Sequence, residues 1–224
     1  MEKIIIVCGG IFDEDLARNL LTEKNNFIIA ADKGLSHLIR MGIRPHAVIG
    51  DFDSVSEMDK VAIETYEKVG DATVIRLNPI KDATDTQAAL ELALERKGDI
   101  YILGGTGRRL DHSIANIRLL GLALEKGRCL TILDTLNRVR MYRATPDSKG
   151  HITIGRNDQY GKYVSLFPIG GPVRGLNMTG FAYPLDDIDI DDFSTLTVSN
   201  EITSEEGDIT FREGTVLIVE SRDN

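Results

Sequence analysis

Two aspartates separated by one residue, Asp51 and Asp53, directly follow an apolar run at positions 47–49. In an extended chain, side chains at this spacing point to the same side, about 6 to 7 Å apart along the strand. Both carboxylates could therefore reach one hydrated cation or two adjacent cations. The segment could equally be a solvated turn in which Asp51 or Ser54 caps a helix beginning near Glu57, because aspartate and serine are favoured caps. On this segment alone, the two interpretations are equally good.

A second acidic pair, Asp82 and Asp85, opens a predicted helix that runs to Lys97. Residues three apart share a helix face, and the free amides and dipole at a helix N-terminus suit anions such as phosphate. A first-turn aspartate also stabilises a helix by roughly 0.3 to 1 kcal/mol, and Thr84 could simply be the helix cap. Taken by itself, the segment favours helix stabilisation.

A glycine- and arginine-rich segment, 103–112 (LGGTGRRLDH), also lies between a predicted strand and a predicted helix. Glycines such as Gly105 let the backbone approach phosphate oxygens, and Arg108 and Arg109 offer planar, permanently charged donors. The segment has neither the Gly-Lys-Ser/Thr ending of a Walker loop nor the dinucleotide fingerprint. A glycine-rich turn with Asp111 as helix cap would look similar. We expect His112 to pack or hydrogen-bond nearby rather than to bind a metal.

These segments must be positioned by a sheet, and the first 140 or so residues alternate short apolar runs with longer amphipathic stretches. That alternation is typical of strands separated by crossover helices, and strands with little polar alternation are usually covered on both faces. It predicts an α/β fold with a mostly parallel, doubly wound sheet. The predicted strands are 4–7, 27–31, 47–49, 73–77, 100–103 and 129–133, and the predicted helices are 14–23, 34–41, 57–69, 84–97 and 113–126.

In a parallel sheet, the three segments and a fourth, 31–34 (ADKG), should meet at one rim, because each follows a predicted strand. Two like charges about 4 Å apart repel by roughly 1 kcal/mol in water and roughly 4 kcal/mol at a protein-like dielectric. Converging aspartates therefore need a cation. Oxygen ligands beside phosphate favour Mg²⁺ over zinc, and the ion would bridge the carboxylates to a nucleoside triphosphate.

The pattern changes after about Thr145, where a turn-rich linker, 146–150, is followed by short runs without a convincing helix. The spacing predicts a small antiparallel β-sandwich or barrel. The chain is thus divided into a domain at 1–145 and a domain at 146–224. The acidic run 186–192, with five aspartates in seven residues, is interpreted as a solvated edge or loop rather than a calcium loop. The predicted strands of the second domain are 152–154, 163–167, 173–176, 195–198, 208–211 and 216–220.

Composition limits the classes of protein that remain. With 42% hydrophobic and 27% charged residues, the 224-residue chain is an ordinary folded protein. A net charge of -9 disfavours a nucleic-acid or membrane surface. No apolar run is long enough for a secretory signal or a membrane span, so we expect a cytoplasmic protein. The two cysteines, Cys8 and Cys129, lie in apolar strand patterns and are expected to be buried thiols.

The segments at 31–34, 50–54 (GDFDS), 81–85 (KDATD) and 104–112 resemble, in order, the bacterial thiamine pyrophosphokinases. The similarity continues through 165–168 (SLFP), 173–176 (VRGL), 180–185 (GFAYPL) and 198–201 (VSNE). Each segment alone is a weak signal, but their order and spacing together are specific, and they span nearly the whole chain.

The resemblance implies transfer of the terminal diphosphate of ATP to the hydroxyl of thiamine, giving thiamine diphosphate and AMP. It implies a homodimer in which an α/β domain is joined to a β-sandwich and thiamine binds at the dimer interface. It implies that Mg²⁺ is held by Asp51, Asp53 and Asp85; that ATP is contacted by Asp32, Thr84, Gly105, Arg108, Arg109 and Asp111; and that thiamine is contacted by Lys81, Asp82, Tyr183, Ser199 and Asn200.

In phosphoryl-type transfer the protein mainly aligns the reacting groups and neutralises the phosphate charge. Asp82 or Asp85 could take the hydroxyl proton. The chain has no Trp, whereas some members of the family stack the substrate on one, so Tyr183 or another group must serve. Segment 181–183 also differs from the family, since it reads Phe-Ala-Tyr where Leu-Lys-Tyr is expected in bacteria.

Two other interpretations remain. Asp51-Phe52-Asp53-Ser54-Val55 also fits an aspartyl-phosphatase pattern, in which the first aspartate is the nucleophile, but that motif normally follows the first strand of its domain. The chain could also be a non-catalytic sensor of thiamine or nucleotide, although a sensor does not need five aspartates at the rim.

Overall fold

The computed structural model describes residues 2–53, 55–78 and 83–223. It divides into two compact units, Met1–Thr135 and Leu136–Asn224. No helix in the described ranges is long and apolar enough to cross a membrane.

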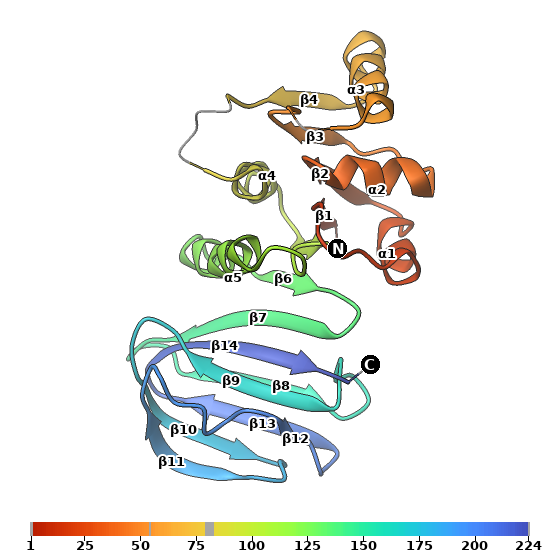
Figure 1. The fold of residues 1–224 in the computed structure, drawn as a ribbon. Coiled ribbons are helices and arrows are strands. Elements are labelled where there is room, and N and C mark those ends of the chain that lie inside the picture. The colour runs from red at the N-terminus through yellow and green to blue at the C-terminus, as the bar shows by residue number, and fades with distance from the viewer. Residues whose placement is uncertain (1, 54, 79–82, 224) are drawn as a thin grey trace. The chain divides into compact units, whose positions relative to one another are not determined.

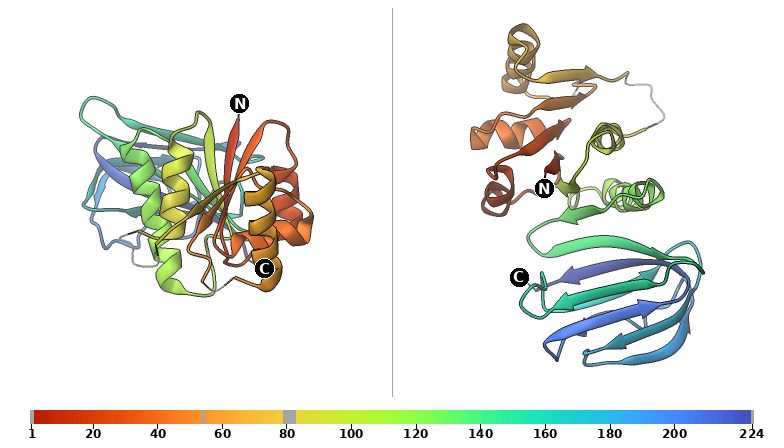
Figure 2. Two further views of the ribbon diagram at one scale, coloured as in Figure 1. Left: turned by 90° about the horizontal axis from the view of Figure 1, so that it is seen from above. Right: turned by 180° about the vertical axis from the view of Figure 1, so that it is seen from behind.

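The first unit is a parallel sheet covered on both faces (Figure 1). Its strand order is β6-β5-β1-β2-β3-β4, and every neighbouring pair in this unit is parallel. Helices α1, α2 and α3 cover one face and α4 and α5 cover the other (Figure 2). The strands are β1 (Lys3–Val7), β2 (Asn26–Ala31), β3 (Ala47–Gly50), β4 (Thr73–Arg76), β5 (Asp99–Leu103) and β6 (Leu130–Leu133). The helices are α1 (Glu14–Leu21), α2 (Gly34–Met41), α3 (Glu57–Val69), α4 (Asp85–Leu94) and α5 (Leu110–Glu125).

This arrangement confirms the predicted doubly wound sheet. The central strand β1 carries Ile4, Ile5 and Ile6, each fully buried, as expected for a strand covered on both faces. Strand order runs outward from β1 toward β4 on one side and through β5 to β6 on the other. The chain therefore changes direction beside β1, and ligands of open α/β sheets bind at such a switch point, beyond the strand carboxyl ends.

The second unit contains two antiparallel sheets, with strand orders β12-β9-β14-β7 and β11-β10-β13-β8. Side chains from both sheets, including Leu166, Met178 and Phe211, form one buried apolar cluster, which confirms the predicted sandwich. The strands are β7 (Asn137–Ala144), β8 (Gly150–Gly155), β9 (Tyr163–Pro168), β10 (Val173–Thr179), β11 (Leu185–Ile190), β12 (Asn200–Glu201), β13 (Glu206–Phe211) and β14 (Gly214–Ser221).

Three features of the second unit differ from the sequence prediction. Strand β7 was not predicted because its arginines obscure the apolar alternation, and its pairing with β14 places the structural division after Thr135, earlier than 145. The acidic run was expected to be a solvated edge or loop, and most of it does form the edge strand β11, although no strand was predicted there. The strand predicted at 195–198 is wrong, because Val198 N–H bonds the Thr195 carbonyl at 3.2 Å in a turn.

One buried carboxylate stands out in this unit. Glu220 on β14 is fully buried and pairs with Arg138 at 2.5 Å and Arg140 at 2.8 Å. Burial is the largest influence and raises its pKa, but the Arg138 and Tyr160 hydrogen bonds and the arginine charges together hold the pKa of Glu220 below its usual value.

The cysteine prediction is half correct. Cys8 is buried, whereas Cys129 lies just before the first residue of β6 and is exposed.

Candidate functional site

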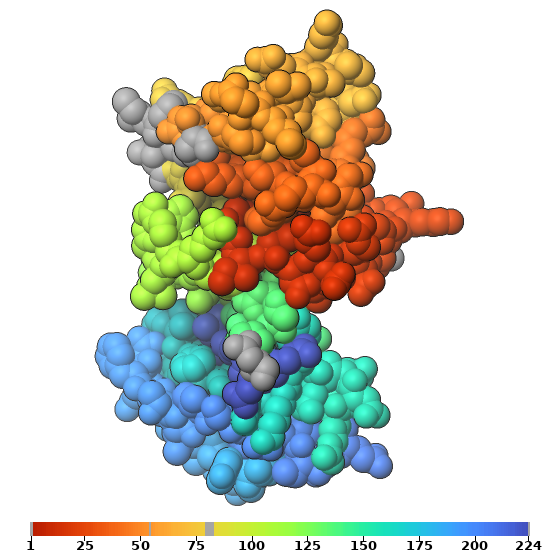
Figure 3. Space-filling model, turned by 45° about the vertical axis from the view of Figure 1, so that its right-hand side comes forward, coloured from red at the N-terminus to blue at the C-terminus, as the bar shows by residue number. Residues whose placement is uncertain are grey.

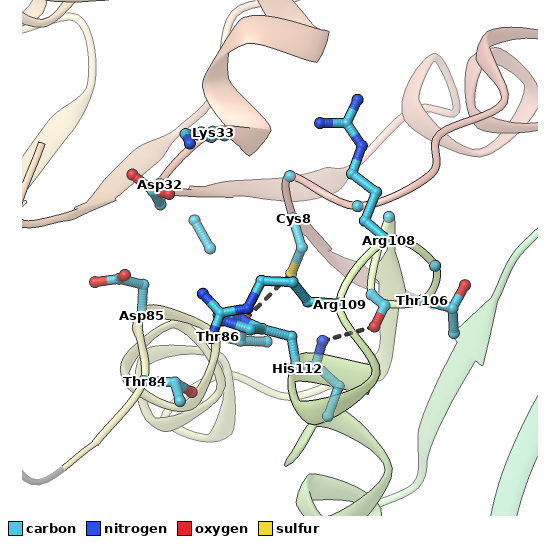
Figure 4. A pocket seen from close by; sticks show the side chains of 17 residues that line it. Cys8, Asp32, Lys33, Thr84, Asp85, Thr86, Thr106, Arg108, Arg109 and His112 are labelled. Carbon is cyan, nitrogen blue, oxygen red and sulfur yellow. Dashed lines mark hydrogen bonds between the residues drawn. The ribbon is translucent and has the colours of Figure 1, made fainter. Parts of the chain in front are cut away.

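A pocket of about 360 Å³ opens at the carboxyl ends of the strands in the first unit. Its walls are the segments that follow β1, β2 and β5, together with the first turns of α4 and α5. The predicted site residues Asp32, Thr84, Asp85, Gly105, Arg108 and Arg109 all line it (Figure 4). The rule that strand carboxyl ends share one rim therefore located this pocket.

Asp32, directly after β2, has an unusual backbone conformation and electrostatic environment. Its backbone has a φ of 45°, and its Oδ1 atom is buried without a hydrogen-bond partner among the described residues. Burial raises the pKa of Asp32, and the charges of Asp85 and Asp51 raise it further, against the opposing effect of the Lys33 backbone. The charges of two other carboxylates thus act on Asp32 at this rim.

Asp51 and Asp53 follow β3, outside the lining of the pocket. Asp51 is partly buried and accepts the Asp53 N–H at 3.3 Å, whereas Asp53 is exposed. The alternative in which Asp51 caps the next helix is wrong, because Ser56 caps α3 and forms a reciprocal capping box with Asp59. Ser54 lies outside the described residues. The charge of Asp51 is therefore not accounted for by helix capping.

These residues fit a metal ion that is held partly by protein carboxylates and partly by phosphate oxygens and water. Among the described ranges, no three His, Cys, Asp or Glu side chains surround one point as a complete protein metal site would. Magnesium is usually held by one or two carboxylates together with phosphate oxygens and water. The orphaned Oδ1 of Asp32, beside the charges of Asp85 and Asp51, suits a cation that arrives with a phosphate ligand.

The first turn of α4 has a structural role as well as a place in the pocket. Thr84 accepts the Gln87 N–H at 3.2 Å and so caps the helix, as one interpretation of the sequence expected. Asp85 is the first residue of the helix, and Thr86 lies 3.5 Å from the Cys8 thiol. Burial raises the pKa of Cys8 to about 12, so this thiol is a packing group and not a nucleophile. The predicted residues Lys81 and Asp82 lie outside the described residues.

Two loops of the pocket are hydrogen-bonded to each other. Gly10 donates its N–H to the Gly104 carbonyl at 2.8 Å, and Ile11 donates to Thr106 at 2.9 Å. A Cβ atom on Gly10 would lie 2.4 Å from both the Gly104 and the Thr106 carbonyl oxygens, so only glycine allows this approach. Figure 3 shows the yellow-green part of the chain lying against the red N-terminal part.

Asn116 on α5 holds the loop at 104–107 in place. It is 6% exposed and donates its side-chain N–H to the Gly105 carbonyl at 2.7 Å. Thr106 donates to the Asp134 carboxylate at 2.6 Å. Sequence reasoning missed Gly9 and Gly10, although they follow β1 and the strand-end rule applies to them. It also missed Thr86 and Asn116, which lie inside helices and carry no comparable signal.

The two arginines of the loop differ in their surroundings. Arg109 forms a two-pronged pair with Asp111, at 3.1 and 2.5 Å, which raises the pKa of Arg109 and lowers the pKa of Asp111. Arg108 has a φ of 56° and no hydrogen bond or ion pair with another described residue. Their side chains point in different directions from the loop (Figure 4). Asp111 is exposed, outside the pocket lining, and does not cap α5.

The predicted thiamine residues of the second unit form a separate group. Asn200, 3% exposed, accepts the Tyr183 N–H at 3.0 Å and donates to the Tyr183 carbonyl at 2.8 Å. The ring of Tyr183 is left 71% exposed. Ser199, with a φ of 58°, is exposed and donates its N–H to Ser165 Oγ at 2.9 Å. Asn200 therefore fixes the backbone of Tyr183 and leaves its side chain exposed.

Comparison with known proteins finds similar sequences over the whole length of the chain. Two family models match: thiamin pyrophosphokinase, catalytic domain, over residues 18–132, and thiamin pyrophosphokinase, vitamin B1 binding domain, over residues 150–216. The thiamine pyrophosphokinase of Bacillus subtilis is 34% identical over 226 residues, covering all of both chains.

Solved structures of related proteins are similar over nearly the whole chain. The crystal structure of the Bacillus subtilis thiamine pyrophosphokinase has a TM-score of 0.87 at 32% identity, covering 99% of this chain and 100% of that one. That of the thiamin pyrophosphokinase from Geobacillus thermodenitrificans has a TM-score of 0.84 at 31% identity, covering 100% and 99% of the two chains.

Proposed function

This chain belongs to the thiamin pyrophosphokinase family, and from that membership we propose that it transfers the diphosphate of ATP to thiamine, yielding thiamine diphosphate and AMP. The observation that carries the proposal is the pocket at the strand ends, where carboxylates, arginines and glycine-rich loops meet in one cavity. In this proposal, the first unit binds ATP and performs the transfer, while the second unit contributes thiamine binding and dimerisation.

Magnesium is the proposed cation, with Asp51, Asp53 and Asp85 as its protein ligands and Asp32 beside them. When bound, the ion would neutralise phosphate charge and help to align the transferring diphosphate. The support from this chain is the charge balance: Asp32 has a buried oxygen without a partner, and its pKa is raised by its burial and by neighbouring carboxylates.

The remaining residues of the pocket act on the nucleotide. Arg108 has no carboxylate partner among the described side chains, so its guanidinium is available to phosphate oxygens. Arg109 is oriented by Asp111. The N-termini of α4 and α5 direct backbone N–H groups at the pocket, which suits phosphate. Thr84 and Gly105 belong to the same ATP-contacting wall.

The hydroxyl proton of thiamine needs an acceptor when the new P–O bond forms. We assign this to Asp85 or Asp82, since both belong to the segment that opens α4. Lys81 and Asp82 are proposed contacts of thiamine and the transferring group. Asp85 lines the pocket from the first position of α4, which is consistent with this role.

Thiamine would contact Tyr183, Ser199 and Asn200 of a partner subunit, which makes the active unit a homodimer. The support is an exposed apolar group on the second unit: Tyr183 is 71% exposed, Phe193 95%, Leu196 64% and Val198 44%. Large apolar side chains left in water favour burial against another surface. Since ATP is the proposed donor, we place the reaction in the cytoplasm.

The test is AMP release from ATP and Mg²⁺, with and without thiamine. We expect thiamine-dependent AMP release that is strongly reduced by Asp51→Asn and Asp53→Asn but not by Asp71→Asn, which removes a surface carboxylate paired with Arg44. Thiamine-independent turnover, or full activity in both site variants, would contradict the proposal. A thiamine sensor would bind thiamine without releasing AMP.

An aspartyl phosphatase would instead form a beryllium fluoride adduct on Asp51 without thiamine. The structure disfavours that alternative, because Asp51 follows β3 rather than the first strand of the unit.

A further inference from the structure

Lys33 is a cation of the pocket to which the proposed reaction assigns no role. It is the residue before α2, it lines the pocket, and it is exposed. Figure 4 shows it beside Asp32, with which it follows β2. Within the described ranges, its ammonium group forms no hydrogen bond or ion pair with another side chain. The charge of Lys33 is therefore available to a ligand of the pocket.

Two glycines fix the place of Lys33 on the pocket wall. A Cβ atom on Gly34 would overlap the Val7 carbonyl oxygen, so α2 begins directly against the end of β1. A Cβ atom on Gly9 would lie 2.6 Å from Lys33 Cβ. The Lys33 side chain therefore leaves the backbone next to Gly9, which also lines the pocket. Since neither glycine position has room for a larger side chain, the fold sets the point from which the Lys33 side chain starts.

Lys33 and the arginines of the glycine-rich loop belong to different strands. Arg108 and Arg109 follow β5, whereas Lys33 follows β2, and β1 lies between these two strands. Because neighbouring strands are about 4.8 Å apart, β5 and β2 are roughly 10 Å apart. The segment after β1, with Gly9, lines the pocket between them. A chain of phosphates that crosses this segment can therefore contact cations at both of its ends.

The acidic residues indicate which end of a triphosphate would lie near Lys33. Asp32 and Asp51 follow β2 and β3, and Asp85 opens α4. In the proposed function, these carboxylates lie around the cation that aligns the transferring diphosphate. The diphosphate end of ATP would then lie on the β2 side of the pocket, and the α-phosphate on the arginine side. Because carboxylates repel phosphate, a cation on the β2 side would offset that repulsion.

We propose that Lys33 is a phosphate-contacting residue of this site: its ammonium group binds the diphosphate end of ATP, on the side of the pocket where the carboxylates gather. A lysine suits this role because its ammonium group is a compact charge with three donors on a flexible stem. The identity of the ligand rests on the proposed function. Binding of a polyphosphate by Lys33 can be measured in the absence of turnover.

Two variants and a matched control test the proposal. Lys33→Met removes the charge and keeps a long unbranched side chain, whereas Lys33→Arg keeps the charge. The control is Lys24→Met. Lys24 is exposed, forms no ion pair with another described residue and lies two residues before β2, whereas Lys33 lies two residues after it. The two methionine variants therefore change the net charge equally, at opposite ends of one strand.

The probes are MgATP, magnesium triphosphate and AMP, each titrated by calorimetry. We expect Lys33→Met to bind both polyphosphates about 5- to 20-fold more weakly, since one charge-assisted hydrogen bond is lost at a solvent-exposed site. AMP binding should stay unchanged, because AMP lacks the two phosphates on the Lys33 side. Lys33→Arg should recover most of the polyphosphate affinity, and Lys24→Met should match the unsubstituted protein.

Unchanged polyphosphate affinity in Lys33→Met, or an equal loss in Lys24→Met, would overturn the proposal. An equal loss of AMP affinity would also overturn it, because it would indicate a general change in the pocket. If Lys33→Met does not fold, Lys33→Gln is judged by the same criteria.

The same titrations separate this proposal from the proposed function. If the unsubstituted chain binds triphosphate but transfers no diphosphate to thiamine, the proposed function fails, while the comparison of Lys33→Met with Lys24→Met still tests the role of Lys33. An unsubstituted chain that binds neither polyphosphate would overturn both.

Discussion

Asp32 and Asp85 face the same pocket from two different elements, and the charge of Asp85 raises the pKa of Asp32. One carboxylate follows β2 and the other begins α4, so the fold itself holds like charges together. Such an arrangement costs stability in the protein alone and is useful only when a cation or a cationic group binds between the carboxylates.

The first prediction concerns the stability cost of this pair. In magnesium-free buffer, Asp32→Asn should unfold about 2 to 4 °C higher, because roughly 1 kcal/mol of burial and repulsion is removed. Asparagine tolerates the positive φ of this position. Calorimetric unfolding measures the shift, and diphosphate transfer should fall in the same variant. Asp71→Asn, which breaks an exposed pair with Arg44, should not stabilise the protein. A less stable Asp32→Asn would refute this reasoning.

The second prediction concerns how the stability difference between Asp32→Asn and the unsubstituted protein depends on pH. The pKa of Asp32 is raised in the folded state, so between the unfolded and folded pKa values the folded protein binds more protons. The contribution of Asp32 to stability therefore falls as pH rises through this interval, and the penalty is complete above the folded pKa. The advantage of Asp32→Asn over the unsubstituted protein should shrink as pH is lowered through the same interval. Unfolding temperatures of both proteins, measured between pH 7 and 4, would show it.

The third prediction concerns the support of the glycine-rich loop. Asn116→Leu should leave the Gly105 carbonyl buried without its donor and cost about 1 to 3 kcal/mol in the first unit. Urea unfolding measures that loss, and the KM for ATP should rise. Asn177→Leu removes a similar bond, from an asparagine amide to the Gly175 carbonyl at 3.1 Å, but in the second unit. It should leave the KM for ATP unchanged; a rise there would mean that the ATP effect is not local.

The fourth prediction concerns the clamp on Tyr183. Asn200→Ala removes both hydrogen bonds to the Tyr183 backbone, so the exposed ring loses its fixed position. The KM for thiamine should rise on the order of tenfold, equivalent to about 1.4 kcal/mol. The KM for ATP should not change. Tyr183→Phe keeps the ring and should act normally, whereas Tyr183→Ala should behave like Asn200→Ala. Equal effects on both substrates would argue against a thiamine role.

The fifth prediction concerns acid stability of the second unit. Glu220 has a folded-state pKa below its usual value, so its contribution to stability is present above the unfolded pKa and lost as pH falls through the folded one. At pH 7, Glu220→Gln should cost about 1.5 to 3 kcal/mol, since charge-assisted bonds to Arg138 and Arg140 are lost. The difference in stability between Glu220→Gln and the unsubstituted protein should become smaller below about pH 4.5. Glu67→Gln, which alters an exposed pair with Arg76, should cost much less.

The sequence was sufficient for most of the first unit. The predicted helices 34–41 and 57–69 match α2 and α3, because Gly42 and Gly70 end them in left-handed conformation. Runs such as Ile4 to Val7 identify strands buried on both faces. Once the strands were parallel, Asp32 and the loop at 104–107 had to meet at one rim, and they do.

Other features depend on contacts that no local pattern records. Asn116 lies inside a helix, and only the folded chain shows that its side chain reaches the Gly105 carbonyl. Strand β7 has no clear apolar alternation, because it contains Arg138, Arg140 and Arg143. These arginines hydrogen-bond to side chains on β14. The sequence also could not show that Asp111 orients Arg109, since both were equally plausible ligands.

The acidic strand β11 has a consequence for the behaviour of the protein at high concentration. It is the last strand of its sheet, so one row of its backbone groups is open to another chain. Asp187 and Asp189 on this strand are paired with Arg212 and Arg174 of the same unit. A second molecule adding its own β11 would bring two rows of carboxylates together. The aspartates that indicated a solvated edge or loop therefore protect the sandwich from edge-to-edge aggregation.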